Sequence, residues 1–368
     1  MKLSMVSKLA ALAILVLCRP ASPTTAEEDA ITRVATLHSA RAAHTATTLP
    51  SGEVLIVGGM SEGGGGLASV ELFDPSQNTV QELGSLAEPR AGHTATLLED
   101  GRVLIAGGYN GNYLRSTEVF DPAAKSFATG GPLVEERSGH TATLLPDGRV
   151  LIVGGVGTRW TFLRSAEVYD PDTGRSEPVG PMSVPRESHT STSLADGRVL
   201  VVGGHSGRRE AMEVYASAEI FSQETGRFEA AGTLVTARHK HDAVRLPDGR
   251  VLVIAGADRT DRTHYATTEI YDLASATFER GPEMAHRRYK IAGTSFLLPD
   301  GDVLVSAGAQ VAEVFDAEVG TFREVPGSFP AAYRFAAAAT LSNGDVLVMG
   351  GYSDSNENTD GVWRYHEP

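Results

Sequence analysis

The sequence is poor in cysteine, in tryptophan and in long apolar runs, and each scarcity excludes a class of protein. Its 368 residues include one cysteine, Cys18, and two tryptophans. Without a disulfide, the fold must be stabilised by packing and hydrogen bonds, for which the hydrophobic fraction of 41% is sufficient. Beyond residue 18, no run approaches the roughly 20 apolar residues that a membrane-spanning helix needs. We therefore expect no transmembrane segment.

Positive charge is also scarce. Lys and Arg number 32 against 46 Asp and Glu, which gives a formal net charge of −14, and no stripe of basic residues interrupts this balance. Such a chain repels phosphate backbones, so we do not expect nucleic acid as a partner. What the sequence has in abundance is glycine, at 40 residues, which indicates many turns.

The first 26 residues follow the pattern of a secretory signal. Lys2 and Lys8 precede the apolar run 9–18, and the small residues Thr24 and Ala26 follow it. We predict a signal peptide over residues 1–26 and a single domain over residues 27–368. The protein is therefore expected to be exported to the periplasm, the cell surface or the medium. Separately, we expect it to be a monomer.

Cys18 leaves an alternative open for this segment. It could be the acylated cysteine of a bacterial lipoprotein, which would add a lipid anchor, or it could simply end the apolar run. The residue before it is Leu17, where a lipoprotein signal normally has Gly, Ala or Ser.

An internal repeat organises the rest of the chain. The runs 93–108 and 140–155 are nearly identical, and a turn glycine between two apolar runs recurs at intervals of 43 to 52 residues. Asp-Gly, Asn-Gly or Ser-Gly between two such runs is a strong signal for a tight β-hairpin. The seven turn glycines are Gly52, Gly101, Gly148, Gly197, Gly249, Gly301 and Gly344.

Each repeat carries four predicted strands, which is the composition of a propeller blade. Two strands flank the turn glycine, a third reads like Glu-Val-Tyr-Asp in 167–170, and a weaker fourth carries an aromatic residue such as Phe127. The last repeat has no fourth strand, whereas the segment 31–37 precedes the first repeat and resembles one. We predict an all-β, seven-bladed propeller whose last blade this segment completes, with six blades as the alternative.

Two features of the repeat resemble the kelch motif. One is the Gly-Gly pair after the second strand, as in Gly154-Gly155, and the other is the third-strand pattern Glu-Val-Tyr/Phe-Asp-Pro. The resemblance covers residues 31–366 and implies a kelch-type propeller similar to the central domain of galactose oxidase. Blades five and six depart from it, with Ala255-Gly256 and Ala307-Gly308.

Residues that recur in nearly every blade are expected to be scaffold, because a single functional site needs residues that differ between blades. This applies to a histidine near the start of each first strand, such as His140, and to the third-strand glutamates, such as Glu167. Equivalent histidines would be spread around the axis, so we expect hydrogen bonds between blades and no metal site. The cluster Arg238-His-Lys-His-Asp242 contains metal-ligand residue types, but alternation along a strand separates its neighbours.

The recurring arginines leave two alternatives, a structural role and contact with a ligand. They stand at the start of the first strand, on the same face as the loops after the second strand. In animal kelch adaptor proteins the matching arginines line the ligand-binding face, so the resemblance implies that role for Arg137 or Arg186. The candidates are Arg90, Arg137, Arg186 and Arg238, with Lys290 at the corresponding place in the sixth repeat.

Specificity is expected from the loops that differ between blades. Tyr113, Trp160 and Tyr265 are candidate stacking surfaces, with the alternative that they only cover neighbouring loops, and Arg208 is a candidate ligand contact. We predict a binding module for a glycan or a protein, with no cofactor, metal or catalytic residue. The alternative is a cofactor-free carbohydrate-active enzyme such as a sugar epimerase or mutarotase. Galactose-oxidase chemistry is not expected, because its copper site needs a cysteine cross-linked to a tyrosine.

Overall fold

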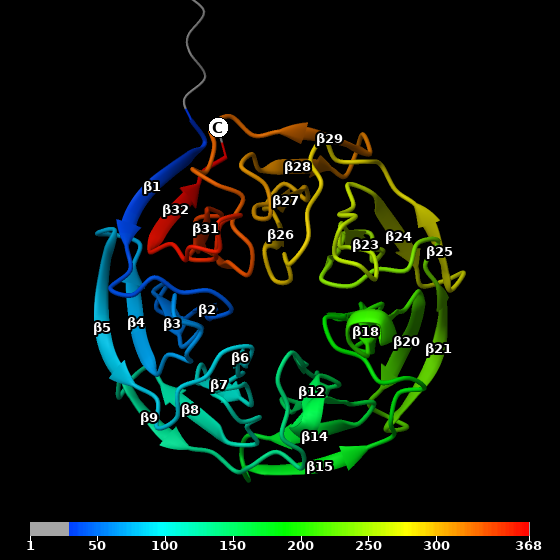
Figure 1. The fold of residues 1–368 in the computed structure, drawn as a ribbon, viewed down its shortest axis with the longest axis horizontal. Coiled ribbons are helices and arrows are strands. Elements are labelled where there is room, and N and C mark those ends of the chain that lie inside the picture. The colour runs from blue at the N-terminus through cyan, green and yellow to red at the C-terminus, as the bar shows by residue number, and fades with distance from the viewer. Residues whose placement is uncertain (1–28, 368) are drawn as a thin grey trace, which may run out of the picture.

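The computed structural model describes residues 29–367, which form a disc of seven four-stranded antiparallel sheets around one axis (Figure 1). In each sheet the first strand lies next to the axis and the fourth at the rim. The predicted signal segment and Cys18 lie outside the described residues. The prediction of a seven-bladed, all-β propeller is confirmed, and the six-bladed alternative is wrong.

Blades 1 to 4 follow one another along the chain. Their strands are, in blade order, β2 (Thr45–Thr48), β3 (Val54–Val57), β4 (Ser69–Asp74) and β5 (Thr79–Ser85); β6 (Thr94–Leu97), β7 (Val103–Ala106), β8 (Thr117–Asp121) and β9 (Ser126–Thr129); β10 (Thr141–Leu144), β11 (Val150–Val153), β14 (Ala166–Asp170) and β15 (Arg175–Val179); and β16 (Thr190–Ser193), β17 (Val199–Val202), β20 (Ser217–Ser222) and β21 (Arg227–Thr233).

Blades 5 to 7 complete the ring. Their strands are β22 (Asp242–Arg245), β23 (Val251–Ile254), β24 (Thr268–Asp272) and β25 (Thr277–Arg280); β26 (Ser295–Leu297), β27 (Val303–Val305), β28 (Glu313–Asp316) and β29 (Thr321–Glu324); and β30 (Ala337–Thr340), β31 (Val346–Met349), β32 (Gly361–Tyr365) and β1 (Ile31–Thr36).

Blade 7 joins the two ends of the ring. β1 pairs antiparallel with β32, so that Ile31 faces Tyr365 and Thr36 faces Gly361. The fourth strand of this blade therefore comes from the segment before blade 1, as the sequence predicts. No edge is left open between the first blade and the last.

The second strand of each blade is apolar at every position because it is covered on both faces by neighbouring blades. In blade 3, for example, all four residues of β11 are fully buried. The hydrophobic core is accordingly divided into seven clusters, each formed between two adjacent blades. The scaffold is held together by contacts between neighbours around the ring.

Short elements decorate the loops on one face. They are the strand pairs β12 (Val156–Gly157) with β13 (Thr161–Phe162) and β18 (His205–Ser206) with β19 (Glu213–Val214), and the 3-10 helices η1 (Thr158–Trp160) and η2 (Arg209–Ala211). Neither helix found in residues 29–367 is long and apolar enough to cross a membrane.

We call this face the upper face. It carries the loops that follow the second strands and the residues that precede the first strands. Backbone bridges connect the two sets, such as Ser138 with Val156 and Glu187 with His205. This confirms the expectation that the two sets share one face.

Candidate functional site

A buried arginine–glutamate pair forms the framework under the upper face. In blade 3, Arg137 Nη2 lies 2.7 Å from Glu167 Oε1, and both side chains are at most 1% exposed. Arg137 Nη1 donates to the Gly154 carbonyl, and the Val134 N–H donates to the other Glu167 oxygen. Five other blades repeat the pair, as Arg41–Glu71, Arg90–Glu118, Arg186–Glu219, Arg238–Glu269 and Arg288–Glu313.

This burial corrects the ligand-binding role considered for four arginines. No part of their side chains is exposed, because each guanidinium is enclosed by carbonyl groups and the third-strand carboxylate of its own blade. Their backbone carbonyls also accept a hydrogen bond from the second glycine of the preceding blade, as Arg186 does from Gly155. The structural alternative therefore applies to Arg90, Arg137, Arg186 and Arg238.

The expected place of Lys290 is also wrong. The residue that pairs with Glu313 in blade 6 is Arg288, two positions earlier. Lys290 instead occupies the position of Gly139 in blade 3 and Lys240 in blade 5, where the backbone turns into the first strand with positive φ. Because Lys290 stands two positions after the framework arginine, it lies at the axis of the disc and not in the buried framework.

The recurring histidines are scaffold, as the sequence predicts. In four places a histidine Nε2 and a threonine Oγ1 of the preceding blade are hydrogen-bonded at 3.0–3.1 Å. Burial lowers the pKa of His93 and of His189 to about 3, which keeps the rings neutral. The pairs are Thr45–His93, Thr94–His140, Thr141–His189 and Thr190–His241.

Blade 6 breaks this pattern, since Ile291 stands where the histidine belongs. Asp242 replaces the threonine that would face it, and its carboxylate accepts the backbone N–H groups of Gly293, Thr294 and Ser295 from the distorted start of blade 6. Burial outweighs these donors and raises the pKa of Asp242 to about 6. Asp242 is therefore a link between blades 5 and 6.

A ring of residues with positive φ surrounds the upper end of the axis. Six of the seven steps around it carry a backbone hydrogen bond of 2.8–3.1 Å from one blade to the next. Within residues 29–367, the step without this bond lies between Gly139 and Ser188. We call this set the axial ring, and it consists of Ala43, Gly92, Gly139, Ser188, Lys240, Lys290 and Phe335.

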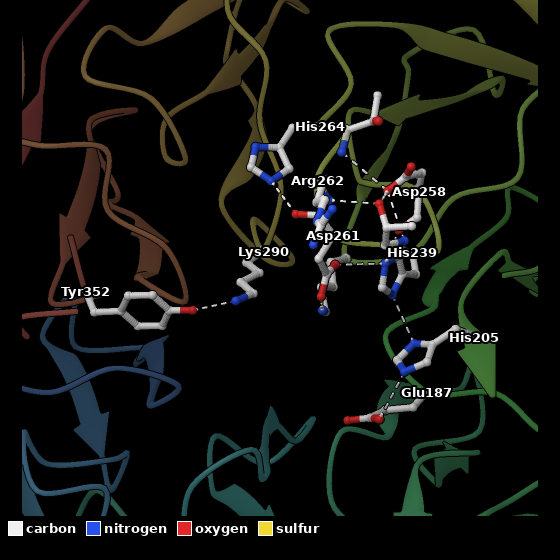
Figure 2. Close-up of polar contacts among 12 residues, drawn as sticks. Glu187, His205, His239, Asp258, Asp261, Arg262, His264, Lys290 and Tyr352 are labelled. Carbon is white, nitrogen blue, oxygen red and sulfur yellow. Dashed lines mark hydrogen bonds and ion pairs between the residues drawn. The ribbon is translucent and has the colours of Figure 1, made fainter. Parts of the chain in front are cut away.

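Figure 2 shows a polar network of Glu187, His205, His239, Asp258 and Asp261, with Lys290 of the axial ring in the same view. His205 and His239 approach each other with their Nδ1 atoms 3.1 Å apart, and His205 Nε2 lies 3.7 Å from Glu187. His239 Nε2 lies 3.1 Å from the Asp258 carbonyl oxygen and 3.0 Å from Asp261 Oδ1. These two acceptors assign the His239 proton to Nε2, so Nδ1 accepts from His205.

Glu187 has a pKa close to neutral pH. A quarter of its side chain is exposed, yet burial raises its pKa to about 7, while Lys240 and Arg208 act in the opposite direction. Its carboxylate lies over Gly139, where a Cβ atom would come within 2.6 Å of Oε1. A side chain at position 139 would therefore displace Glu187.

Two lysines complete the site. Lys240 forms an ion pair with Asp261, and burial together with the Lys290 ammonium lowers the pKa of Lys240. Lys290 Nζ donates to Tyr352 Oη at 2.6 Å. We call the axial ring and this surrounding group, formed by Glu187, His205, His239, Asp261 and Tyr352, the axial mouth.

The predicted aromatic surfaces have different surroundings. Trp160 is 45% exposed, meets Tyr113 edge to face and is covered by the Arg208 guanidinium, so these three form one surface on blades 2, 3 and 4. Burial raises the pKa of Tyr113 to about 12. The Tyr265 ring centroid lies 5.5 Å from Cζ of the buried Arg238 of the same blade, so this ring packs on the framework.

Sequence reasoning missed most of the axial mouth. Glu187 and His239 occupy the position directly after the framework arginine, which is Ala42, Ala91 and Ser138 in blades 1 to 3. A comparison of this position across the repeats would have found the change from small to titratable residues. The change occurs within the repeat itself and not in a loop after a second strand.

No group of three or more His, Cys, Asp or Glu side chains among the described residues is arranged to hold a metal ion. The comparison with known families matches the kelch motif at residues 89–133 and 137–183, which are blades 2 and 3. The described residues therefore form a seven-bladed β-propeller that contains kelch motifs, matched in blades 2 and 3.

One similar solved structure is a novel fungal alcohol oxidase with catalytic diversity among the AA5 family, in complex with copper. The sequences are 17% identical over 92% of this chain and 76% of that chain, with a TM-score of 0.71. At this identity the similarity shows the fold alone, and the copper is a property of that protein. No curated protein matches this sequence.

Proposed function

We propose that this protein is an exported interaction module that binds a glycan or a protein at the axial mouth. The supporting observation is the contrast between blades. The buried framework repeats around the disc, whereas charged and titratable side chains of residues 29–367 gather at the mouth where blades 4 to 7 meet it. Binding surfaces are typically formed by such non-repeated residues on a rigid scaffold.

The wide upper face supports binding in a second way. Trp160, Tyr113 and Arg208 offer an exposed aromatic and cationic surface beside the mouth. A ligand large enough to cover both areas would contact blades 2 to 7. An extended glycan or a protein loop has the necessary size.

The test is a glycan array and an affinity pull-down with the chain from residue 27. Saturable binding that weakens in Lys290→Met and in Trp160→Ala supports the proposal. The matched control is Lys125→Met, because Lys125 also has positive φ but lies half-exposed beside Glu53 in the turn between β8 and β9. Equal binding by all variants would contradict a site on the upper face.

One observation favours a cofactor-free sugar isomerase as a second candidate. Glu187 has a pKa of about 7 and lies within reach of Lys240 at an open mouth, which suits an acid–base group at neutral pH. Exchange of sugar anomers, followed by NMR without added metal, tests it. Catalysis that persists in Glu187→Gln would exclude this role for Glu187.

A further inference from the structure

Lys290 has donor capacity that the fold does not use. Its ammonium makes one hydrogen bond, to Tyr352 Oη, and no carboxylate in residues 29–367 forms an ion pair with it. Three aromatic rings, those of Tyr289, Phe335 and Tyr352, have their centroids 5.0–5.4 Å from Nζ. The rings hold the ammonium in position, and two of its N–H groups remain for a ligand.

Tyr352 has a free donor at the same place. Because Lys290 donates to Oη, the Tyr352 hydroxyl proton is left for another acceptor. Burial raises the pKa of Tyr352, so the hydroxyl stays protonated at neutral pH. A hydroxyl beside an ammonium is an arrangement that recognises a carboxylate.

Lys240 and Lys290 are placed next to each other at a conformational cost. Both have left-handed backbones, with φ of 56° and 58°, at positions that are glycine in blades 2 and 3. The Lys290 N–H donates to the Lys240 carbonyl at 2.8 Å, so the two residues are adjacent in the axial ring. Strained residues of this kind concentrate at binding sites, and two neighbouring ammonium groups favour an anion between them.

The other charged groups of the mouth do not neutralise Lys290. Asp261 is shared between Lys240 and His239, and Arg334 is paired with Asp354, whose side chain is 74% exposed. Glu187, with its pKa of about 7, carries only part of a charge at neutral pH. Lys290 is thus the cation of the mouth whose counter-ion is missing from residues 29–367.

A polar recess of about 630 Å³ has Arg334 and Ser353 in its lining, and Arg334 exchanges backbone hydrogen bonds with Tyr352 of the mouth. It opens because blade 6 has a short loop after β27, between the blade 5 loop at His264 and the blade 7 loop at 353–355. Gln310, Asp354 and two serines offer hydrogen-bonding groups, and alanines form part of the wall. The volume suits a sugar ring, and the stacked rings of His264 and Tyr289 lie at its side.

We propose that the axial mouth recognises an acidic sugar, whose carboxylate binds Lys290, Tyr352 and Lys240 while its ring occupies the recess of blade 6. This inference rests on the proposed function and names its ligand class. The carboxylate supplies the missing counter-ion, and the recess supplies partners for hydroxyl groups. A neutral sugar would leave Lys290 without its counter-ion.

The test compares D-glucuronate with D-glucose, which differ only in the carboxylate at C6, by NMR titration of the chain from residue 27. We expect glucuronate to bind at least about tenfold more tightly than glucose. Lys290→Met should remove this preference, and Tyr352→Phe should reduce it. Lys125→Met should leave it unchanged, and thermal melting shows whether each variant is folded.

Each other outcome overturns a defined part of the argument. Equal affinity for the two sugars, or a preference that survives in folded Lys290→Met, overturns the carboxylate assignment but leaves glycan binding intact. Binding of N-acetylglutamate as tight as that of glucuronate overturns the sugar assignment. If neither sugar binds while the pull-down captures a specific protein, only this inference fails. If array, pull-down and titration are all negative, the proposed function fails too.

Discussion

The buried pair of Arg137 and Glu167 allows the framework to be tested against the ligand-binding role that the kelch resemblance implies. Arg137→Met removes the guanidinium and leaves the Glu167 carboxylate, which is 1% exposed, with the Val134 N–H as its remaining donor. An uncompensated buried charge of this kind costs about 3–5 kcal/mol. For a chain of this length, an unfolding entropy of about 0.7 kcal/mol/K converts that cost into a midpoint lowered by roughly 4–7 °C.

The assay is thermal unfolding followed by circular dichroism, with two companion variants. The double variant Arg137→Met/Glu167→Gln removes both charges and should recover part of the lost stability, because no charge is left unpaired. Arg102→Met changes an arginine that is 34% exposed and pairs with Asp100 on the surface, so it should alter stability by less than about 1 kcal/mol. An unchanged midpoint in Arg137→Met combined with weaker ligand binding would refute the structural role.

Three further predictions concern the contacts between blades. Gly154→Ala should lower the free energy of unfolding, measured by urea titration, by about 1–3 kcal/mol, because φ is 63° and the added Cβ would lie 2.5 Å from the Arg186 carbonyl oxygen. The control Ala255→Gly, at the equivalent position of blade 5, should leave this free energy nearly unchanged. The pKa of Asp242 is raised from 3.8 to about 6, so the folded state binds the proton more tightly and stability is lost as pH rises through this interval, by about 3 kcal/mol. Asp242→Asn should remove this pH dependence, and equal slopes in both proteins would argue against it. Deletion of residues 1–36 should expose the edge of β32, lower the midpoint and cause association in size-exclusion chromatography, and an unchanged monomer would count against the closure.

The fold could be predicted because the repeat supplies its own comparison. Each turn glycine has positive φ, as Gly148 does at 83°, so its spacing marks every hairpin of the ring. The missing fourth strand of the last repeat and the strand-like segment before the first identify the closure. Both are properties of strand pattern and order along the chain, which sequence expresses directly.

The site could be predicted only in part because it depends on side-chain direction. The sequence places Arg137 at the start of a strand on the upper face, but not the rotation that points its guanidinium inward to Glu167. The axial mouth depends on loops of different length, for whose conformation no repeat provides a template, and on the lysine side chains at positions 240 and 290, where blades 2 and 3 have glycine. Alternation along a strand predicts that His239 and its neighbours point apart, and the sequence gives no sign of the approach of His239 to His205.

The division of the core into seven clusters has a consequence for how a ligand would act on the whole molecule. Each blade is held by its two neighbours, so the disc resembles a closed chain of links in which a defect stays local. A sugar bound to Lys240, Lys290 and Tyr352 would contact blades 5, 6 and 7. It would therefore stabilise two consecutive contacts between blades, that of blades 5 and 6 and that of blades 6 and 7. Occupancy of the mouth should therefore protect the amides of the blade 5–6 and 6–7 contacts from hydrogen exchange, while those across the disc exchange as before.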